Sequence, residues 1–421
     1  MMTVVSFLIL LGVVVTVHEC GHFIVARRNG VRVLKFSIGF GPTVWKKESH
    51  GTEFAVSAIP LGGYVKMAGE NLEEIQNHPD EFASKSLWQR AKIVFAGPAV
   101  NILLAFLLMP FVFLIGTKEP VYLNQPAKVG WVDNDSPAQM AGMKDGDLIA
   151  RIDQTPIDSW KELRKAMIGK NFKSVQVKRG ENLVELNTRG DLTGIYPDLR
   201  PEVQKVLPGK PAERAGLHEE DLLVSVDGHR IAGLSHFYYL IVDRAGDTVN
   251  LEILRHGSPM TVPVVPLYDK KSKRVIIGIV MGAESRLVRY GPIDALQSGL
   301  DSLIDSITMT FAAIGKLITG KQSLDTLGGP IGIARMSGEA ARVGLGSFIG
   351  LMAMISLQLG IFNLLPIPVL DGGWILLIGI EAVRGKALSK KVIQVAQMTG
   401  LIFLLALIVY VSINDVMKLF R

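Results

Sequence analysis

Two histidines and a glutamate stand together near the start of the chain, in the run His18-Glu19-Cys20-Gly21-His22. On a helix, positions i and i+4 share a face, so both imidazoles can reach one metal ion. Glu19 stands beside them and can take a proton from a water at the metal. Histidines that only pack between helices are the alternative, but three ionisable side chains inside an apolar stretch are costly and call for a function. The pattern therefore predicts a metalloenzyme in which Glu19 is the general base.

A catalytic zinc ion needs a third protein ligand and an open fourth position. Asp371 is the only charged residue in the apolar stretch 343–380. His18 and Asp371 precede the charged ends of their own stretches by nine and ten residues. At about 1.5 Å of helical rise per residue, the histidines and Asp371 would lie roughly 8–15 Å inside the same membrane face. Cys20 is another candidate, but at i+2 from His18 it points to a different side of the helix. We expect His18, His22 and Asp371 to hold Zn²⁺.

The elements that would position these residues are transmembrane segments. The chain has 421 residues, of which 48% are hydrophobic and 20% charged, which is too apolar for a wholly soluble protein. Four segments are apolar and long enough to cross a bilayer, at 1–30, 93–117, 343–380 and 392–414. The first has no basic residue before its apolar core and no small-x-small cleavage site after it, so we expect it to be retained rather than removed as a signal peptide.

The charges indicate a membrane protein with a defined orientation. The net charge is +6, but the basic residues do not form one basic block. We therefore expect no nucleic-acid partner and expect the lipid bilayer to surround the protein. A single cysteine excludes an intramolecular disulfide. Basic residues that flank the segments predict which loops face the cytoplasm; they are Arg27, Arg28, Arg32, Lys35, Arg90, Lys92, Arg384, Lys386, Lys390 and Lys391. The long segment from Lys118 to about Ala341 and both termini would then lie outside.

The segments between the spans have distinct patterns. Residues 31–70 contain short strand-like runs broken by glycine, at 31–38, 52–59 and 62–67, which predicts a membrane-associated β region. Residues 71–92 are expected to form a cytoplasmic loop. A helical apolar stripe runs through 290–320, which indicates an amphipathic helix that lies on the outer membrane surface or packs on the bundle.

An internal repeat occupies the long outer segment. Pro137, Asp147 and Ile157 recur 74 positions later, as do the residues around them, at Pro211, Asp221 and Ile231. A constant offset indicates two copies of one domain. Both copies resemble the core of a PDZ domain, which predicts PDZ domains at 120–200 and 201–282. A PDZ domain binds an extended peptide at a sheet edge, although a spacer that binds nothing is the alternative.

Five motifs, of which the histidine motif is the first, carry a family resemblance. The chain contains HECGHF at 18–23, GFGP at 39–42, IPLGGYVKM at 59–67, FAGPAVN at 95–101 and NLLPIPVLDGG at 363–373. Together with the repeat, they cover nearly the whole chain, which resembles the site-2 protease family of intramembrane zinc metalloproteases. The resemblance implies that His18, His22 and Asp371 hold zinc, that Glu19 is the catalytic base, and that Asn363, Pro366 and Pro368 shape the substrate cleft.

The implied function is regulated intramembrane proteolysis. The predicted fold is a polytopic α-helical membrane protein with four transmembrane segments, a membrane-associated β region and two tandem PDZ domains. By resemblance it would lie in a bacterial inner membrane, with periplasmic PDZ domains and the active site within the membrane near the cytoplasmic face. Its substrates would be single-span proteins, such as an anti-sigma factor already cut on its outer side in a stress response, and remnant signal peptides.

Two alternatives would use the same parts differently. A metalloprotease with its site in the aqueous phase would take its third ligand from a soluble segment, and the position of Asp371 argues against it. A membrane-anchored PDZ scaffold or receptor without proteolytic activity would have no use for the complete set of His18, Glu19, His22 and Asp371.

Overall fold

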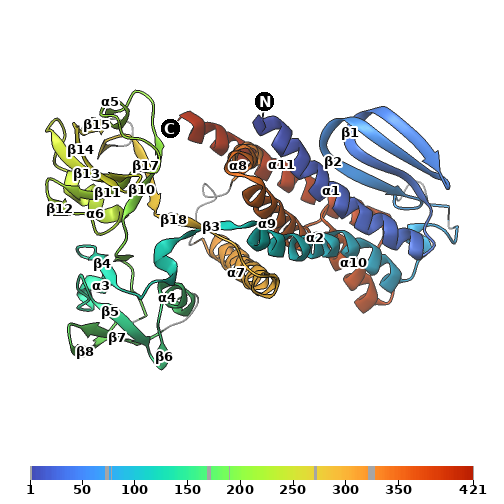
Figure 1. Cartoon of the computed structure of the whole chain (residues 1–421). Helices are drawn as coiled ribbons and strands as arrows, with labels where there is room; N and C mark the ends of the chain where they lie inside the picture. The colour runs from blue at the N-terminus through green and yellow to red at the C-terminus, as the bar shows by residue number, and fades with distance from the viewer. Residues whose placement is uncertain are drawn as a thin grey trace. The chain divides into compact units, whose positions relative to one another are not determined.

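The computed structural model describes residues 2–71, 75–76, 78–167, 172–188, 190–269, 273–320 and 328–420 (Figure 1). Small parts of the predicted cytoplasmic loop and of both predicted PDZ domains therefore lie outside the described residues. The chain divides into two compact units, which are taken one at a time. Unit 1 comprises Met1–Thr117 and Arg289–Arg421, and unit 2 comprises Lys118–Val288.

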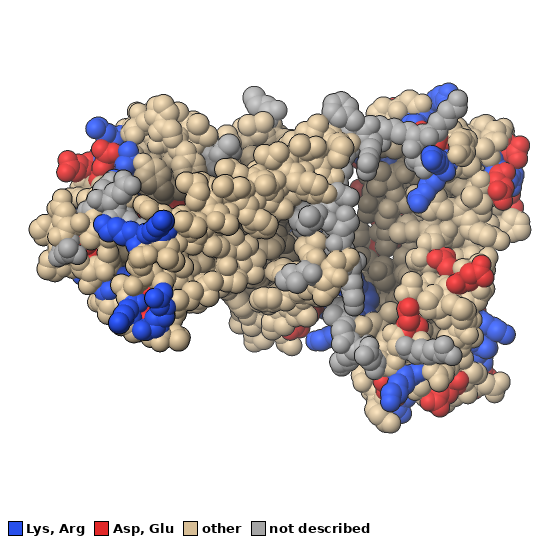
Figure 2. All heavy atoms as spheres, turned by 180° about the vertical axis from the view of Figure 1, so that it is seen from behind, with Lys and Arg blue, Asp and Glu red and all other residues tan. Residues whose placement is uncertain are grey.

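Unit 1 is a helical bundle with a small β region. Its helices and strands, in chain order, are α1 (Met2–Arg28), β1 (Val33–Ser49), β2 (Thr52–Met67), the 3₁₀ helix η1 (Phe82–Ser84), α2 (Leu87–Ile115), α7 (Pro292–Ile318), α8 (Pro330–Val343), α9 (Leu345–Asn363), α10 (Asp371–Arg384) and α11 (Lys390–Phe420). Among the described residues, four helices are long and apolar enough to cross a membrane, namely α1, α2, α9 and α11. Figure 2 shows a broad surface over these helices without Lys, Arg, Asp or Glu, and basic side chains gathered toward the end that carries β1 and β2.

The second helix begins earlier than its apolar run predicts. Ser86 and Gln89 form a capping box, in which the Ser86 hydroxyl accepts from the Gln89 N–H and the Gln89 side chain accepts from the Ser86 N–H. This arrangement satisfies donors that the first helical turn leaves unpaired. As a result α2 starts at Leu87, six residues before the predicted 93–117 segment, and includes the polar residues Arg90 and Lys92.

The predicted segment 343–380 forms two helices, with the break before Asp371 that its two prolines indicate. α9 ends at Asn363 and α10 begins at Asp371, with an irregular stretch of residues 364–370 between them. Pro366 and Pro368 lie in that stretch, where the missing N–H groups and fixed backbone angles of proline prevent a continuous helix. The break places Asp371 at the first position of a helix.

α2 is the central helix of the bundle, because it packs against α1, α7, α9 and α10. Gly360 of α9 lets the two backbones approach closely, since a Cβ there would lie 2.9 Å from the Pro98 carbonyl oxygen. The amphipathic helix predicted at 290–320 is α7. Its Leu303 is fully buried in a cluster with residues of α2 and α9, so of the two placements left open, α7 packs on the bundle.

The β region is more extensive than the three short runs predicted. The Val33–Ile38 part of β1 pairs on one side with Gly63–Met67. On its other side it pairs with residues 53–56, at the start of β2. The start of β2 also pairs with residues 43–49 of β1. Residues 63–67 therefore form one edge of the sheet. The strand at 43–49 was not predicted, because its Lys46, Lys47 and Glu48 interrupt any apolar alternation.

Unit 2 contains two copies of one arrangement. The first copy comprises β4 (Val129–Val132), α3 (Pro137–Met140), β5 (Leu148–Ile152), β6 (Thr155–Pro156), α4 (Trp160–Met167), β7 (Ser174–Arg179), β8 (Asn182–Asn187) and β9 (Ile195–Pro197). The second comprises β10 (Pro201–Val206), α5 (Pro211–Arg214), β11 (Leu222–Val226), β12 (His229–Arg230), α6 (Leu234–Ile241), β13 (Val249–Arg255), β14 (Ser258–Val264), β15 (Leu267–Asp269), β16 (Arg274–Ile276) and β17 (Ile279–Ala283). β3 (Thr117–Pro120) pairs with β18 (Ser285–Val288), and the 3₁₀ helix η2 (Val121–Asn124) follows β3.

The two copies share their strand pairing and an ion pair whose carboxylate is buried. β5 lies between β6 and β7 as β11 lies between β12 and β13, and each copy has its own apolar core. Arg179 donates to both carboxylate oxygens of Asp147, at 2.8 and 2.7 Å, and Arg255 donates to Asp221 at the same distances. The repeat seen in the sequence is therefore a repeat of structure.

Candidate metal centre

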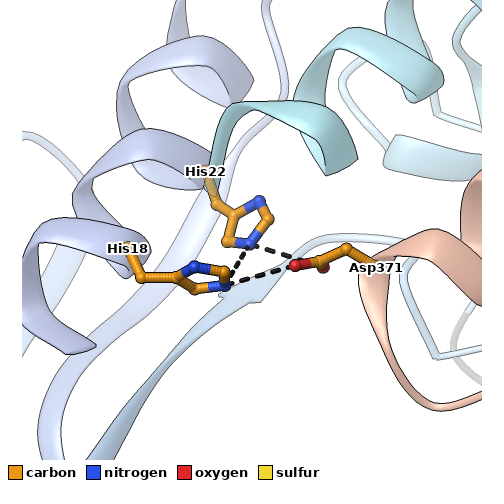
Figure 3. Close-up of side chains that lie close together, drawn as sticks. All are labelled: His18, His22 and Asp371. Atoms are coloured by element: carbon orange, nitrogen blue, oxygen red, sulfur yellow. Dashed lines mark hydrogen bonds and ion pairs between the residues drawn. The ribbon is translucent and has the colours of Figure 1, made fainter. Parts of the chain in front are cut away.

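Three side chains converge from two helices of unit 1. His18 and His22 lie on one face of α1, one helical turn apart, and Asp371 reaches them from the start of α10 (Figure 3). The two Nε2 atoms are 3.1 Å apart. The Asp371 carboxylate oxygens lie 3.2 Å from His18 Nε2 and 3.5 Å from His22 Nε2. The structure thus brings together the three residues expected to be ligands.

The geometry of these atoms fits a zinc ion. Zinc binds imidazole nitrogen and carboxylate oxygen at about 2.0–2.2 Å in a tetrahedron, whose ligand atoms are then roughly 3.3–3.6 Å apart. The observed separations of 3.1, 3.2 and 3.5 Å lie close to those tetrahedral edges. Two neutral imidazoles and one carboxylate also leave the fourth position open, as a catalytic site requires.

Helix α2 supplies the partners that orient the imidazoles. His22 Nδ1 lies 2.9 Å from the carbonyl oxygen of Ile93. Because a carbonyl can only accept, Nδ1 carries the proton and Nε2 keeps a lone pair that could bind a metal ion. His18 Nδ1 lies 3.3 Å from the side-chain amide of Asn101. Gly97 leaves room for both rings, because a Cβ there would lie 2.6 Å from His22 Cε1 and 2.8 Å from His18 Cε1.

Glu19 lines the same cavity as the three convergent residues. The cavity has a volume of about 290 Å³ and is also lined by Tyr64, Val65 and Asn363. The Glu19 carboxylate accepts a hydrogen bond from the backbone N–H of Val65 in β2, which ties its position to the sheet. A carboxylate held beside the three candidate ligands in a space large enough for water and a peptide group can act as a general base.

A second carboxylate borders the cavity. Glu70, just after β2, accepts a hydrogen bond of 3.0 Å from the Met67 N–H. Burial raises the pKa of the Glu70 carboxyl, against the lowering effect of that hydrogen bond.

The residues expected to shape the substrate cleft lie in different places. Asn363, the last residue of α9, lines the cavity. Pro366 is exposed in the break before α10, and Pro368 packs through its carbonyl group against Gly400 of α11. Neither proline is part of the cavity lining. Cys20 packs instead with the apolar cluster that contains Ala26 and Val33, so it lies outside the ligand set.

Three site residues were not identified as such from the sequence: Gly97, Asn101 and Val65. The first two belong to the run FAGPAVN, whose glycine and asparagine inside an apolar helix were a signal that could have been read. Their contact with His18 and His22 depends on how α1 packs on α2, which the sequence does not state. Val65 acts through its backbone N–H, so its side chain carries no signal.

Comparison with known proteins identifies the family. The model of Peptidase family M50 matches residues 6–407. The chain is 35% identical to the regulator of sigma-E protease RseP of Escherichia coli (strain K12), over 98% of both chains. It is 34% identical to protease RseP of Yersinia pestis and 33% identical to the regulator of sigma E protease of Haemophilus influenzae, again over 98% of each chain. These matches confirm the family predicted from the motifs: the chain belongs to peptidase family M50, the site-2 protease family of membrane metalloproteases.

Proposed function

We propose that this chain is a zinc-dependent endopeptidase that cuts single-span membrane proteins within the bilayer. In this proposal His18, His22 and Asp371 hold the zinc ion, and Glu19 is the general base. The observation that carries it is the set of three ligand atoms, separated by 3.1–3.5 Å, whose two histidines lie in an apolar helix long enough to cross a membrane.

The roles of the residues follow from their positions. Zinc, when bound, supplies a Lewis acid that activates water and polarises the scissile carbonyl group. Glu19 takes the proton of the attacking water and delivers it to the amine that leaves, so its carboxylate returns to its starting state. The Val65 N–H keeps this carboxylate oriented toward the cavity. The Asn363 amide borders the same space and can bind the substrate backbone.

The sheet edge beside the cavity is suited to hold an unwound substrate. A peptide bond in a helix is protected by the helix's own hydrogen bonds, so a substrate segment must unwind, and its freed backbone groups then need partners within the membrane. Residues 63–67 form an edge of the sheet, and Tyr64, Val65 and Met67 line the cavity. A substrate that adds to this edge as a strand would gain those partners beside the metal.

The sheet has the surface of an element in contact with lipid. Five large apolar side chains on it are exposed in unit 1, namely Phe40, Val44, Trp45, Val56 and Ile59. Exposed apolar side chains that follow one another on a sheet are expected to meet a membrane or a partner. Together with the basic residues at this end of unit 1 (Figure 2), they support placing the β region at the cytoplasmic face of the membrane.

Unit 2 would then lie outside the membrane, in the periplasm of a bacterial cell with this protein in its inner membrane. We propose that its two repeats are PDZ domains, as their motifs indicate. The names of the relatives, regulators of sigma-E protease, support a role in a sigma-factor stress response. The proposed substrates are a membrane-bound anti-sigma factor already trimmed on its outer side, and remnant signal peptides.

A purified reporter tests the proposal. A single-span substrate is reconstituted with the enzyme in lipid, and its cleavage is measured with and without a zinc chelator. We expect cleavage that the chelator abolishes and added zinc restores, and a Glu19→Gln enzyme that binds zinc but does not cut. Cleavage by zinc-loaded Glu19→Gln at the normal rate would remove Glu19 from the mechanism, and an inert wild-type enzyme with bound zinc would favour a scaffold or receptor.

We propose that unit 2 acts as a size filter, which admits substrates whose outer domain has been shed and blocks those whose outer domain is bulky. A deletion tests this role. Residues from about 121 to 280 are replaced by a short flexible linker. The deletion enzyme is expected to cut trimmed reporters as before and also full-length reporters that the intact enzyme spares, because a bulky outer domain is no longer excluded. Loss of cleavage of trimmed reporters by a stable, zinc-loaded deletion protein would instead indicate that unit 2 recruits substrates.

A further inference from the structure

The side chain of Asn101 is an unusual polar group in the middle of an apolar helix. Asn101 is fully buried where α2 packs against α1 and α9. The side-chain nitrogen lies 3.3 Å from His18 Nδ1, whereas Oδ1 is buried without a hydrogen-bond partner among the described residues. The Asn101 carbonyl oxygen accepts from the Ser356 hydroxyl at 2.8 Å, which fixes the backbone here against α9.

The amide orientation determines which nitrogen of His18 is free. With Nδ2 of Asn101 toward the ring, the amide can only donate, so His18 Nδ1 must be the acceptor and the proton must sit on Nε2. A protonated Nε2 can donate to Asp371, 3.2 Å away, but it cannot bind a metal ion. In this orientation the convergent residues form a hydrogen-bonded cluster without metal.

The opposite orientation makes His18 a ligand. The oxygen and nitrogen of a side-chain amide have nearly the same shape, so a half-turn about the Cβ–Cγ bond exchanges them without moving the backbone. Oδ1 would then face His18 Nδ1 and accept its proton, which leaves the Nε2 lone pair for the metal. The same turn gives the unpartnered oxygen the partner that it lacks.

We propose that Asn101 is a positioning residue, whose side-chain oxygen accepts from His18 Nδ1–H and so holds His18 in the tautomer that binds zinc. The inference rests on the proposed function of the metal centre and adds to it a second orienting contact. His22 has the equivalent contact with the Ile93 carbonyl, also from α2. One helix therefore sets the tautomers of both histidines, and a hydrogen-bond acceptor behind each metal-bound imidazole is a general feature of zinc sites.

Two substitutions and a matched control test this role in the full-length protein in detergent. Asn101→Leu removes the acceptor at similar volume, and Asn101→Asp keeps an acceptor oxygen but no amide donor. Ser356→Ala removes a buried hydrogen bond from the same contact between α2 and α9 without touching His18. Zinc affinity is measured by competition with a chelator, and the thermal stability of the zinc-free protein is measured in parallel.

We expect Asn101→Leu to weaken zinc binding about 10- to 100-fold, the usual effect of removing such a partner. Asn101→Asp should bind zinc at least as tightly as the wild type, and Ser356→Ala should leave the affinity unchanged. Wild-type affinity in a folded Asn101→Leu protein would overturn the inference. An Asp variant as weak as the Leu variant would also overturn it, because the amide donor would then be the group that matters.

A spectroscopic measurement needs no variant. In zinc-loaded wild-type protein with ¹⁵N-labelled histidine, we expect His18 to show a protonated Nδ1 and a metal-bound Nε2. A metal-bound Nδ1 would overturn the role of Asn101 even if the variants do not fold. Failure of the wild type to bind zinc would instead contradict the proposed function, so the two failures are distinguishable.

Discussion

Gly97 is the position at which one methyl group should disable the metal centre. It lies on α2 directly over both imidazoles, so an alanine Cβ would lie 2.6 Å from His22 Cε1 and 2.8 Å from His18 Cε1. Ordinary contact begins at 3.4 Å, so the His22 ring must move by at least 0.8 Å (3.4 − 2.6). Zinc–ligand distances tolerate deviations of only about 0.2 Å. The side chains can move more easily than the packed α2 backbone, so the metal site changes while the fold remains.

The expected effect of Gly97→Ala is zinc binding at least about 100-fold weaker, since a displacement of about 1 Å commonly costs that much in a precise site. This factor corresponds to about 2.7 kcal/mol. Gly12→Ala is the matched control, because it makes the same change in α1 where no atom lies within 4 Å of the new Cβ. Zinc affinity is measured by chelator competition in detergent, next to the thermal stability of the zinc-free proteins. A folded Gly97→Ala protein with the affinity of the Gly12→Ala control would show that the site does not need the space at Gly97.

Three further changes have specific expected results. Asp371→Ala should lower zinc affinity and stop cleavage, because two imidazoles alone leave the ion short of a ligand; unchanged zinc content in the folded protein would place the third ligand elsewhere. Cys20→Ala should keep the wild-type zinc stoichiometry, and stoichiometric loss of zinc would contradict the ligand set. Acidification should destabilise unit 2 through Asp221. Burial alone would raise the pKa of Asp221. Hydrogen bonds from Arg255 and the His218 N–H nevertheless hold that pKa below its ordinary value. The carboxylate therefore adds stability above about pH 4, which is lost as the pH falls through the lowered pKa of the folded state. Denaturant unfolding at stepped pH should show this loss in the wild type and not in Asp221→Asn; equal pH dependence in both would contradict it.

The elements with strong local patterns could be predicted from the sequence. Four apolar runs predicted the long helices α1, α2 and α9 to α11, and the stripe of 290–320 predicted α7. Pro366 and Pro368 indicated a break before Asp371, whereas helix α8 (Pro330–Val343), which ends where the predicted third span begins, was not predicted. The constant offset of 74 residues predicted a duplication, and the same strand pairing occurs twice in unit 2.

The features that were missed depend on contacts between distant segments. The two ends of β2 pair with opposite sides of the same part of β1, and glycines such as Gly39 and Gly63 let the backbones of β1 and β2 approach closely. No local sequence pattern predicts that pairing. In the metal centre, His18, His22 and Asp371 could be chosen by residue type and depth. Gly97 and Asn101 offered only the signal of a glycine and an asparagine inside an apolar helix, because their contact with the histidines appears only when α1 and α2 are packed together.

X-ray absorption at the zinc edge of the purified, zinc-loaded protein tests the ligand set most directly. The arrangement of His18, His22 and Asp371 predicts four nitrogen or oxygen neighbours at about 2.0–2.2 Å, with the outer-shell signal of two imidazoles, and the same spectrum for Glu19→Gln. Asp371→Ala should lose one of these neighbours or the zinc itself. A sulfur neighbour at about 2.3 Å, or an unchanged spectrum in zinc-loaded Asp371→Ala, would contradict the ligand set of His18, His22 and Asp371.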